Sequence, residues 1–171
     1  MQQHPLGPLR LYQVFSHFKP DLIITLGTGD GELDNVLGHY WKLKSYDIED
    51  RRSFLYCHKN YPDRQQDYGG RKDTYEFKQC DIFSAEIVDE IRYLIANHEK
   101  VAVLCDNGDK PKEVALFSGM IKPTDIILAH DYTSCVTWGW DEFSDADIPD
   151  RIQKHPQYDL EDCAWFVGKL K

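Results

Sequence analysis

Residues 21–32 read DLIITLGTGDGE, and this stretch decides the fold. Its first half is apolar and rich in β-branched residues, as in a buried strand, and Gly27, Gly29 and Gly31 follow it. Glycine lets the backbone turn sharply and lets a ligand approach without a Cβ in the way. A helix that begins just after such a turn directs unpaired N–H groups towards that ligand. The stretch therefore predicts a strand, a ligand-binding turn and a helix.

An acidic residue supports the ligand-binding interpretation. The next short apolar run, Tyr46 to Ile48, contains Asp47 at the end of the predicted second strand. A carboxylate in that position can accept hydrogen bonds from a ribose diol. Turn and acid together indicate a cofactor that contains a nucleoside. The alternative is a glycine-rich turn that only joins a strand to a helix.

The glycine spacing separates two classes of cofactor. Dinucleotide-binding proteins have G-x-G-x-x-G, whereas Glu32 occupies the position of the third glycine here, which disfavours a nicotinamide-dependent oxidoreductase. The observed G-x-G-x-G resembles the first motif of class I S-adenosylmethionine-dependent methyltransferases. That family usually has an acid two residues before the first glycine; Thr25 stands there and brings no charge towards the cofactor's amino group. The resemblance implies that the cofactor-binding residues are Gly27, Thr28, Gly29, Asp30, Gly31, Asp47, Ile48, Asp81, Ile82 and Asp106.

Length, charge and cysteine usage limit the possible functions. With 171 residues, 42% of them hydrophobic, the chain is expected to form one domain with its own core. A net charge of −9 argues against a nucleic-acid or membrane-surface partner, which would require a basic face. The N-terminus has no signal-peptide pattern. The five cysteines form no C-x-x-C pair and fit free thiols in a reducing cytoplasm.

Apolar runs alternate with amphipathic segments along the chain. This order predicts an α/β fold: a single doubly wound Rossmann-like domain over residues 1–171, with a mostly parallel sheet and helices on both faces. Ser84 is expected to cap a helix whose apolar positions run from Ile87 to Ile95. The other expected helices are 9–18, 32–41 and 112–120, and the expected strands are 22–26, 44–48, 75–79, 101–105, 126–129 and 164–167.

Two segments are expected to be irregular. Residues 49–74 are polar and rich in tyrosine, and a connection of this length is usually functional, so they are a candidate lid or substrate loop. Residues 132–157 follow the predicted fifth strand and contain Trp138 and Trp140 beside several acids. These tryptophans either plug the end of the sheet or contact a ligand.

The segments VLCDNGDKPKE (103–113) and IILAHDY (126–132) resemble metal-dependent O-methyltransferases of the cephalosporin hydroxylase-like and sugar O-methyltransferase branch. In that branch, acids after strands four and five hold a magnesium ion, which implies metal ligands at Asp106, His130 and Asp131. Imidazole is a poor ligand for a hard ion, so the alternatives are a weaker magnesium site, manganese or iron, or no metal. Lys110 lies near the position of a general base in catechol-type relatives, and we name Lys110 and His130 as the candidate catalytic residues.

The resemblance implies methyl transfer from S-adenosylmethionine to a hydroxyl of a small molecule, with Mg²⁺ or Mn²⁺ as a candidate second cofactor. Two other hypotheses stay open: a catalytically silent methyltransferase-like domain that acts as a binding or assembly module, and the disfavoured nicotinamide enzyme. The expected partner is a small hydroxylated acceptor, not nucleic acid or a membrane, and the chain could form a homo-oligomer.

Overall fold

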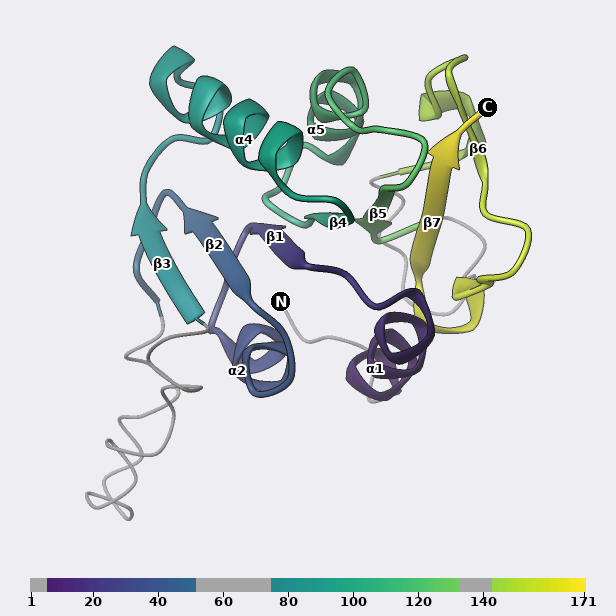
Figure 1. Ribbon diagram of the computed structural model, residues 1–171, viewed down its shortest axis with the longest axis horizontal. Coiled ribbons are helices and arrows are strands. Elements are labelled where there is room, and N and C mark those ends of the chain that lie inside the picture. Colours follow the sequence, from purple (N-terminus) through teal and green to yellow (C-terminus); the bar gives the residue numbers. More distant parts are fainter. Residues whose placement is uncertain (1–5, 52–74, 133–142) are drawn as a thin grey trace.

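The structure, a computed structural model, describes residues 6–51, 75–132 and 143–171. Its strands form one seven-stranded sheet in the order β3-β2-β1-β4-β5-β7-β6 (Figure 1). The first five strands in this order are parallel to one another, whereas β7 runs antiparallel to both β5 and β6. The expectation of a mostly parallel sheet is therefore confirmed. The strands are β1 (Leu22–Leu26), β2 (Leu43–Asp47), β3 (Tyr75–Gln79), β4 (Val101–Cys105), β5 (Ile126–His130), β6 (Ile152–Lys154) and β7 (Trp165–Leu170).

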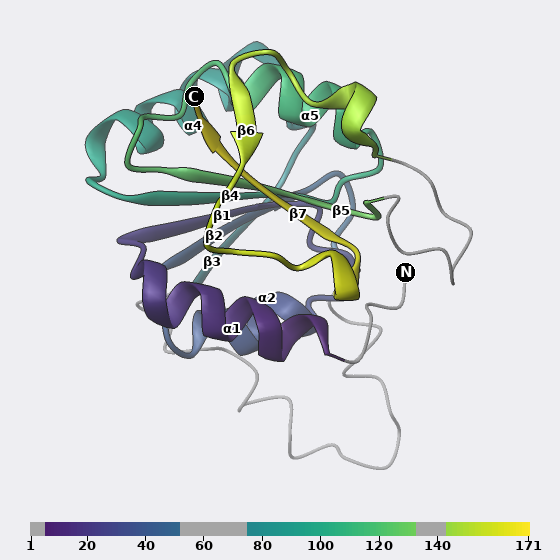
Figure 2. The same cartoon turned by 90° about the vertical axis from the view of Figure 1, so that its right-hand side faces the viewer.

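Helices cover both faces of the sheet, as Figure 2 shows from the side. One face carries α1 (Gly7–Phe18) and α2 (Glu32–Gly38), and the other carries α4 (Ala85–Asn97) and α5 (Lys110–Phe117). Two short 3₁₀ helices, η2 (Asp145–Asp147) and η3 (Glu161–Cys163), flank β6 in sequence. Among the described residues, no helix has the length and apolar character needed to cross a membrane.

Side chains of the central strands alternate between two hydrophobic cores. In β1, Ile23 packs in the α1/α2 core, whereas Leu22 and Ile24 pack in the α4/α5 core. The same alternation places Leu104 of β4 on the α1/α2 side and Val103 on the α4/α5 side. Because both faces of a central parallel strand are covered, β4 is apolar throughout, and β1 is apolar at every position except Thr25.

The sheet has its topological switch point between β1 and β4. The chain leaves β1 for β2 on one side and later returns to β4 on the other side of β1. Loops that follow the carboxyl ends of β1 and β4 therefore diverge to opposite faces and leave a crevice between them, where ligands of open α/β sheets bind.

Several element boundaries differ from the sequence expectations. The helix expected at 32–41 ends at Gly38, and the one expected at 112–120 runs from Lys110 to Phe117, because the Asp109 side chain accepts a hydrogen bond from the Lys112 amide and so starts the helix earlier. Ser84 does hold the N-cap position of α4, but its side chain makes no capping hydrogen bond. The last strand extends to Leu170.

The irregular segment expected at 132–157 is partly regular in its described portion. It contains η2 and the strand β6, whose Ile-Gln-Lys sequence is too short and polar to be recognised by its pattern. Trp138 and Trp140 lie outside the described residues, as does the expected loop at 49–74 beyond Arg51.

Candidate functional site

The glycine turn after β1 bends through backbone conformations that favour glycine. Gly27, Gly29 and Gly31 have φ values of 91°, 55° and 85°. A Cβ on Gly27 would lie 2.2 Å from the carbonyl oxygen of Asp106, so this position is closed by the end of β4. A Cβ on Gly29 would meet nothing within 4 Å. Gly27 therefore serves strand packing, whereas Gly29 leaves the open space through which a ligand can approach.

Asp47 holds this turn from the neighbouring strand. Its side chain is buried, and its two oxygens accept hydrogen bonds from the amides of Gly29, at 2.9 Å, and Glu49, at 3.0 Å. Each carboxylate oxygen has a second lone pair, so both remain able to accept from a ligand hydroxyl. The residue predicted to bind a ribose thus also fixes the shape of the turn.

A buried polar chain beneath the turn was not anticipated from the sequence. Thr28 in the turn and Asp34 on α2 both hydrogen-bond to the hydroxyl of Ser45, the central residue of β2. All three residues are almost completely buried. The sequence signal was Ser45 itself, a polar residue on the face of β2 that otherwise packs into the α1/α2 core. This chain links the turn, the helix and the strand into one unit.

A cavity of about 220 Å³ opens at the carboxyl ends of β1, β2, β4 and β5. The Thr25 hydroxyl is buried and has no hydrogen-bond partner among the described residues, and Thr25 lines this cavity. An unpaired buried hydroxyl is costly, so a ligand that bonds to it would remove that cost. The lining residues are Pro8, Thr25, Gly27, Thr28, Gly29, Asp30, Glu32, Leu33, Asp34, Asp47, Ile48, Arg51, Asp106, Asn107, Gly108 and His130.

Two residues that the resemblance placed at the cofactor, Asp81 and Ile82, are not among the residues that line this cavity. The Asp81 carboxylate accepts a hydrogen bond from the Phe83 amide at 2.9 Å, as an acid does in a turn that precedes a helix. Ile82 is fully buried in the α4/α5 core. Their side chains have structural contacts here, and their predicted role at the adenine stays a prediction.

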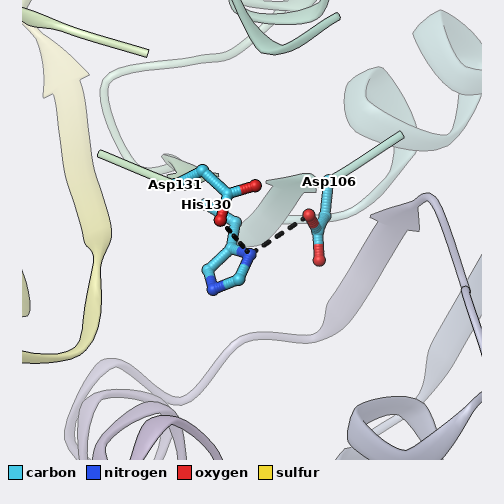
Figure 3. A group of neighbouring side chains, drawn as sticks. All are labelled: Asp106, His130 and Asp131. Carbon is cyan, nitrogen blue, oxygen red and sulfur yellow. Dashed lines mark hydrogen bonds and ion pairs between the residues drawn. The ribbon is translucent and has the colours of Figure 1, made fainter. Parts of the chain in front are cut away.

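Asp106, His130 and Asp131 converge at the ends of β4 and β5, as their positions after neighbouring strands predict (Figure 3). Their candidate ligand atoms all lie within 4.8 Å of one another. His130 Nδ1 lies 3.3 Å from Asp106 Oδ1 and 3.3 Å from Asp131 Oδ1. Asp131 has a φ of 56°, an unusual conformation for a residue other than glycine. The backbone is thus bent where this acid joins the cluster.

Lys110 completes the cluster from the first residue of α5. Its side chain is fully buried, with Nζ 2.9 Å from Asp131 Oδ2 and 3.6 Å from Asp106 Oδ1. Lys110, the candidate base, thus does not line the cavity. Its amine is instead engaged in ion pairs with both acids.

His130 presents one ring nitrogen to the acids and keeps the other clear of them. Although burial favours the neutral ring, the hydrogen bond to Asp106 and the charges of Asp106 and Asp131 together raise the pKa of His130 above its usual value. The two acceptors that face Nδ1 assign the proton to that atom, and Nε2 points away from both acids in Figure 3. The ring also packs against Trp165, with centroids 4.7 Å apart. The arrangement can orient His130 as a base that acts through Nε2.

Glu113 supports the loop that carries Asp106. This fully buried carboxylate on α5 accepts hydrogen bonds from the amides of Asn107, at 3.3 Å, and Asp109, at 3.2 Å. Burial raises the pKa of Glu113 to about 7, although these two amides act in the opposite direction. Sequence reasoning missed Glu113, because a glutamate in the first turn of a helix is ordinarily a solvated residue.

No protein-family model matches the sequence, and no curated protein does either. Solved structures do match. An RNA methyltransferase from Salinibacter ruber in complex with S-adenosyl-L-homocysteine aligns with a TM-score of 0.56 at 18% identity, over 99% of this chain and 94% of its own. A Staphylococcus aureus protein assigned as a caffeoyl-CoA O-methyltransferase aligns with a TM-score of 0.61 at 6% identity, over 100% and 86%.

The chain has the class I methyltransferase fold. A mutant of MtNAS also aligns, with a TM-score of 0.59 at 13% identity, and this chain spans only 58% of that protein's length. In this methyltransferase fold the glycine turn, Asp47 and Asp106 come together around one cavity at the switch point of the sheet. That cavity is the candidate active site.

Proposed function

We propose that this protein transfers a methyl group from S-adenosylmethionine to a hydroxyl group of a small molecule. The observation that carries the proposal is the cavity itself, because the open glycine turn and buried Asp47 at one end face His130 and Asp106 at the other. A nucleoside fits the first end, where Thr25 and Asp47 offer hydrogen-bonding oxygens. When bound, S-adenosylmethionine supplies a sulfonium methyl group, and its transfer leaves a neutral thioether.

His130 is the residue that we assign to proton removal. As the acceptor oxygen attacks the methyl carbon, its proton passes to His130 Nε2, and the developing positive charge on the ring is stabilised by Asp106 and Asp131. The carboxylates also hold the ring in one orientation, so the base is positioned before the acceptor binds. The remaining contribution of the protein is the alignment of acceptor and donor in the cavity.

The divalent metal ion that the resemblance implies would be repelled at this cluster by the positive charge of Lys110. The ligand atoms of Asp106, His130 and Asp131 are close enough to hold an ion together. However, the amine of Lys110 already pairs with both carboxylates from a fully buried position. At an effective dielectric constant of about 20, charges of +2 and +1 about 4 Å apart repel by about 8 kcal/mol, which offsets part of the ion's attraction to the two carboxylates. The residues fit a divalent ion by position, but Lys110 already pairs with both of its acids, and no catalytic step is assigned to a metal.

The expected acceptor is small and is not a nucleic acid. The net charge of −9 opposes binding to a polyanion, and acids outnumber bases among the residues that line the cavity. The alternative, a silent binding module, predicts cofactor binding without turnover.

Calorimetric titration with S-adenosylhomocysteine and with NAD tests the cofactor assignment. We expect the wild-type protein to bind S-adenosylhomocysteine and not NAD. Asp47→Asn keeps an oxygen for the Gly29 amide but loses the charge towards the ribose, and it should weaken S-adenosylhomocysteine binding by about 1.5–3 kcal/mol. Asp89→Asn, on the outer surface of α4, is the matched control. Equal affinities in wild type and Asp47→Asn would refute the ribose assignment.

Turnover is tested with S-adenosylmethionine and a panel of hydroxylated small molecules, with S-adenosylhomocysteine formation as the readout. His130→Gln should lose at least about 100-fold in rate with an active acceptor, while S-adenosylhomocysteine affinity stays within a factor of about 3. Binding without turnover across the panel would favour the silent module.

A further inference from the structure

We propose that Lys110 is a built-in cation that takes the place of a divalent metal ion at the Asp106–His130–Asp131 cluster. The inference concerns how this cluster balances its charge, and it does not depend on which acceptor the protein methylates. It departs from the resemblance, which implies a bound ion at these residues.

The four side chains form a closed ring of alternating acids and bases. Lys110 Nζ lies 2.9 Å from Asp131, which lies 3.3 Å from His130 Nδ1. The same imidazole nitrogen lies 3.3 Å from Asp106, which lies 3.6 Å from Lys110 Nζ. Every acid therefore has a base on each side. The ring is closed by protein atoms alone.

Formal charges show why a dication is not needed. Two carboxylates carry −2, and the Lys110 ammonium cancels half of that charge. The His130 imidazole places its Nδ1 between the same two acids, so protein groups meet both carboxylates without an added ion. A dication in addition to Lys110 would give the cluster an excess positive charge, whereas Mg²⁺ is held in proteins chiefly by carboxylates whose charge is not already paired.

Burial separates Lys110 from an ordinary surface lysine. Its side chain is fully buried, whereas the neighbouring Lys112 on the same helix is exposed, with its amine over the Phe83 ring. A buried ammonium is stable only when it is paired, and the two acids provide that pairing. Lys110 is also anchored at the start of α5, directly after the Asp109 cap. The amine is thus fixed relative to the strand ends that carry the acids.

Thermal melting of the full chain after treatment with a chelator tests the inference. Magnesium chloride and manganese chloride are the probes, each compared with sodium chloride at the same ionic strength. The wild type should show no saturable rise in Tm at metal concentrations up to about 10 mM, which is about 10-fold above the millimolar concentrations that fill weak sites. Lys110→Met keeps the length of the side chain and removes its charge. This variant should melt lower than wild type and should gain about 5–10 °C when manganese reaches about 100 times its Kd.

Three further variants make the outcome specific to the cluster. Lys110→Met/Asp131→Asn removes one charge of each sign, so it should melt higher than Lys110→Met and should not respond to manganese. Lys112→Met, the control on the same helix, should behave as wild type. Asp131→Asn alone should also show no metal response. Electron paramagnetic resonance of added Mn²⁺ counts bound ions directly and is independent of both folding stability and activity.

One result would overturn the proposal even if Lys110→Met did not fold. A saturable Tm rise in wild type with either metal, lost in Asp131→Asn, would show that a dication binds beside Lys110. Failure of the proposed methyl transfer is separate, because it would appear as absent S-adenosylhomocysteine binding or turnover and would not alter the metal response.

Discussion

Single residues in the turn after β1 have different physical roles although they share one motif. Gly27 is constrained by the backbone of Asp106, whereas the space beside Gly29 is open. Both have positive φ, so a side chain at either position pays a conformational cost. Only at Gly27 does a steric clash add to that cost. The G-x-G-x-G pattern thus combines a packing requirement with a ligand-access requirement.

Alanine substitutions at these two glycines should therefore behave differently. Gly27→Ala should lower the free energy of unfolding by about 3–5 kcal/mol, since both overpacking and a positive φ act against it. Gly29→Ala should lower it by only about 1–2 kcal/mol, but should weaken S-adenosylhomocysteine binding because the new methyl group projects into the open space. Urea denaturation and calorimetry measure the two effects. Equal stability losses at the two positions would contradict this division of roles.

At the scale of elements, α5 organises the end of β4. Asp109 caps the start of the helix, and Lys110 forms ion pairs with the acids at the strand ends. Glu113 accepts hydrogen bonds from two backbone amides of the connecting turn. Successive residues of one helix turn thus fix the loop that positions Asp106. Helix α5 is therefore part of the candidate site as well as a cover for the sheet.

Glu113 should make stability depend on pH. Its pKa is about 7 in the folded protein, against an ordinary value of 4.5. Between these values the folded protein holds a proton that the unfolded chain has lost, so the free energy of unfolding falls as pH rises through this window, by about 3 kcal/mol in all. Glu113→Gln removes the titration, and its amide oxygen can still accept one of the two N–H bonds.

Urea denaturation of both proteins between pH 4.5 and pH 8 provides the measurement. The difference in free energy of unfolding, variant minus wild type, should rise with pH across the window and level off above pH 7. Control substitutions at the exposed Glu99 should leave the profile unchanged. A constant difference between variant and wild type at every pH would show that Glu113 is ionised throughout.

At the scale of the whole molecule, two cores on opposite faces of the sheet enclose the cysteines unequally. Cys105 and Cys163 are completely buried, Cys80 is partly exposed, and all three are free thiols. Burial also raises the pKa of the Cys105 and Cys80 thiols, which lowers their reactivity. Cys57 and Cys135 lie outside the described residues.

Alkylation without reductant should therefore distinguish native from unfolded protein. In denaturant, mass spectrometry should find all five cysteines modified, as expected for a chain without disulfides. In the native protein, Cys80 should be alkylated slowly. Cys105 and Cys163 should remain unmodified over the same time. A disulfide in the native protein would overturn the expectation of a reducing cytoplasm.

Local sequence signals were sufficient to predict a mostly parallel sheet and most of its strands. Strands 22–26, 75–79 and 101–105 were predicted with the bounds that the structure shows, and for 22–26 and 101–105 the local signal was a short, largely apolar run. It also predicted that Asp106, His130 and Asp131 converge, since parallel neighbouring strands bring their carboxyl ends to one edge. The strand β6 was missed, because three residues of mixed polarity give no periodic signal.

The charge of the candidate site, in contrast, follows from contacts between segments that are distant in the sequence. In sequence, Lys110 belongs to a polar D-K-P-K run that resembles a solvated surface, yet the packing of α5 against β4 and β5 buries it completely between two acids. Likewise, nothing local to Ser45 indicates that it joins Thr28 and Asp34 across three elements. Burial and ion pairing are properties of distant segments brought together, so no pattern within one segment can encode them.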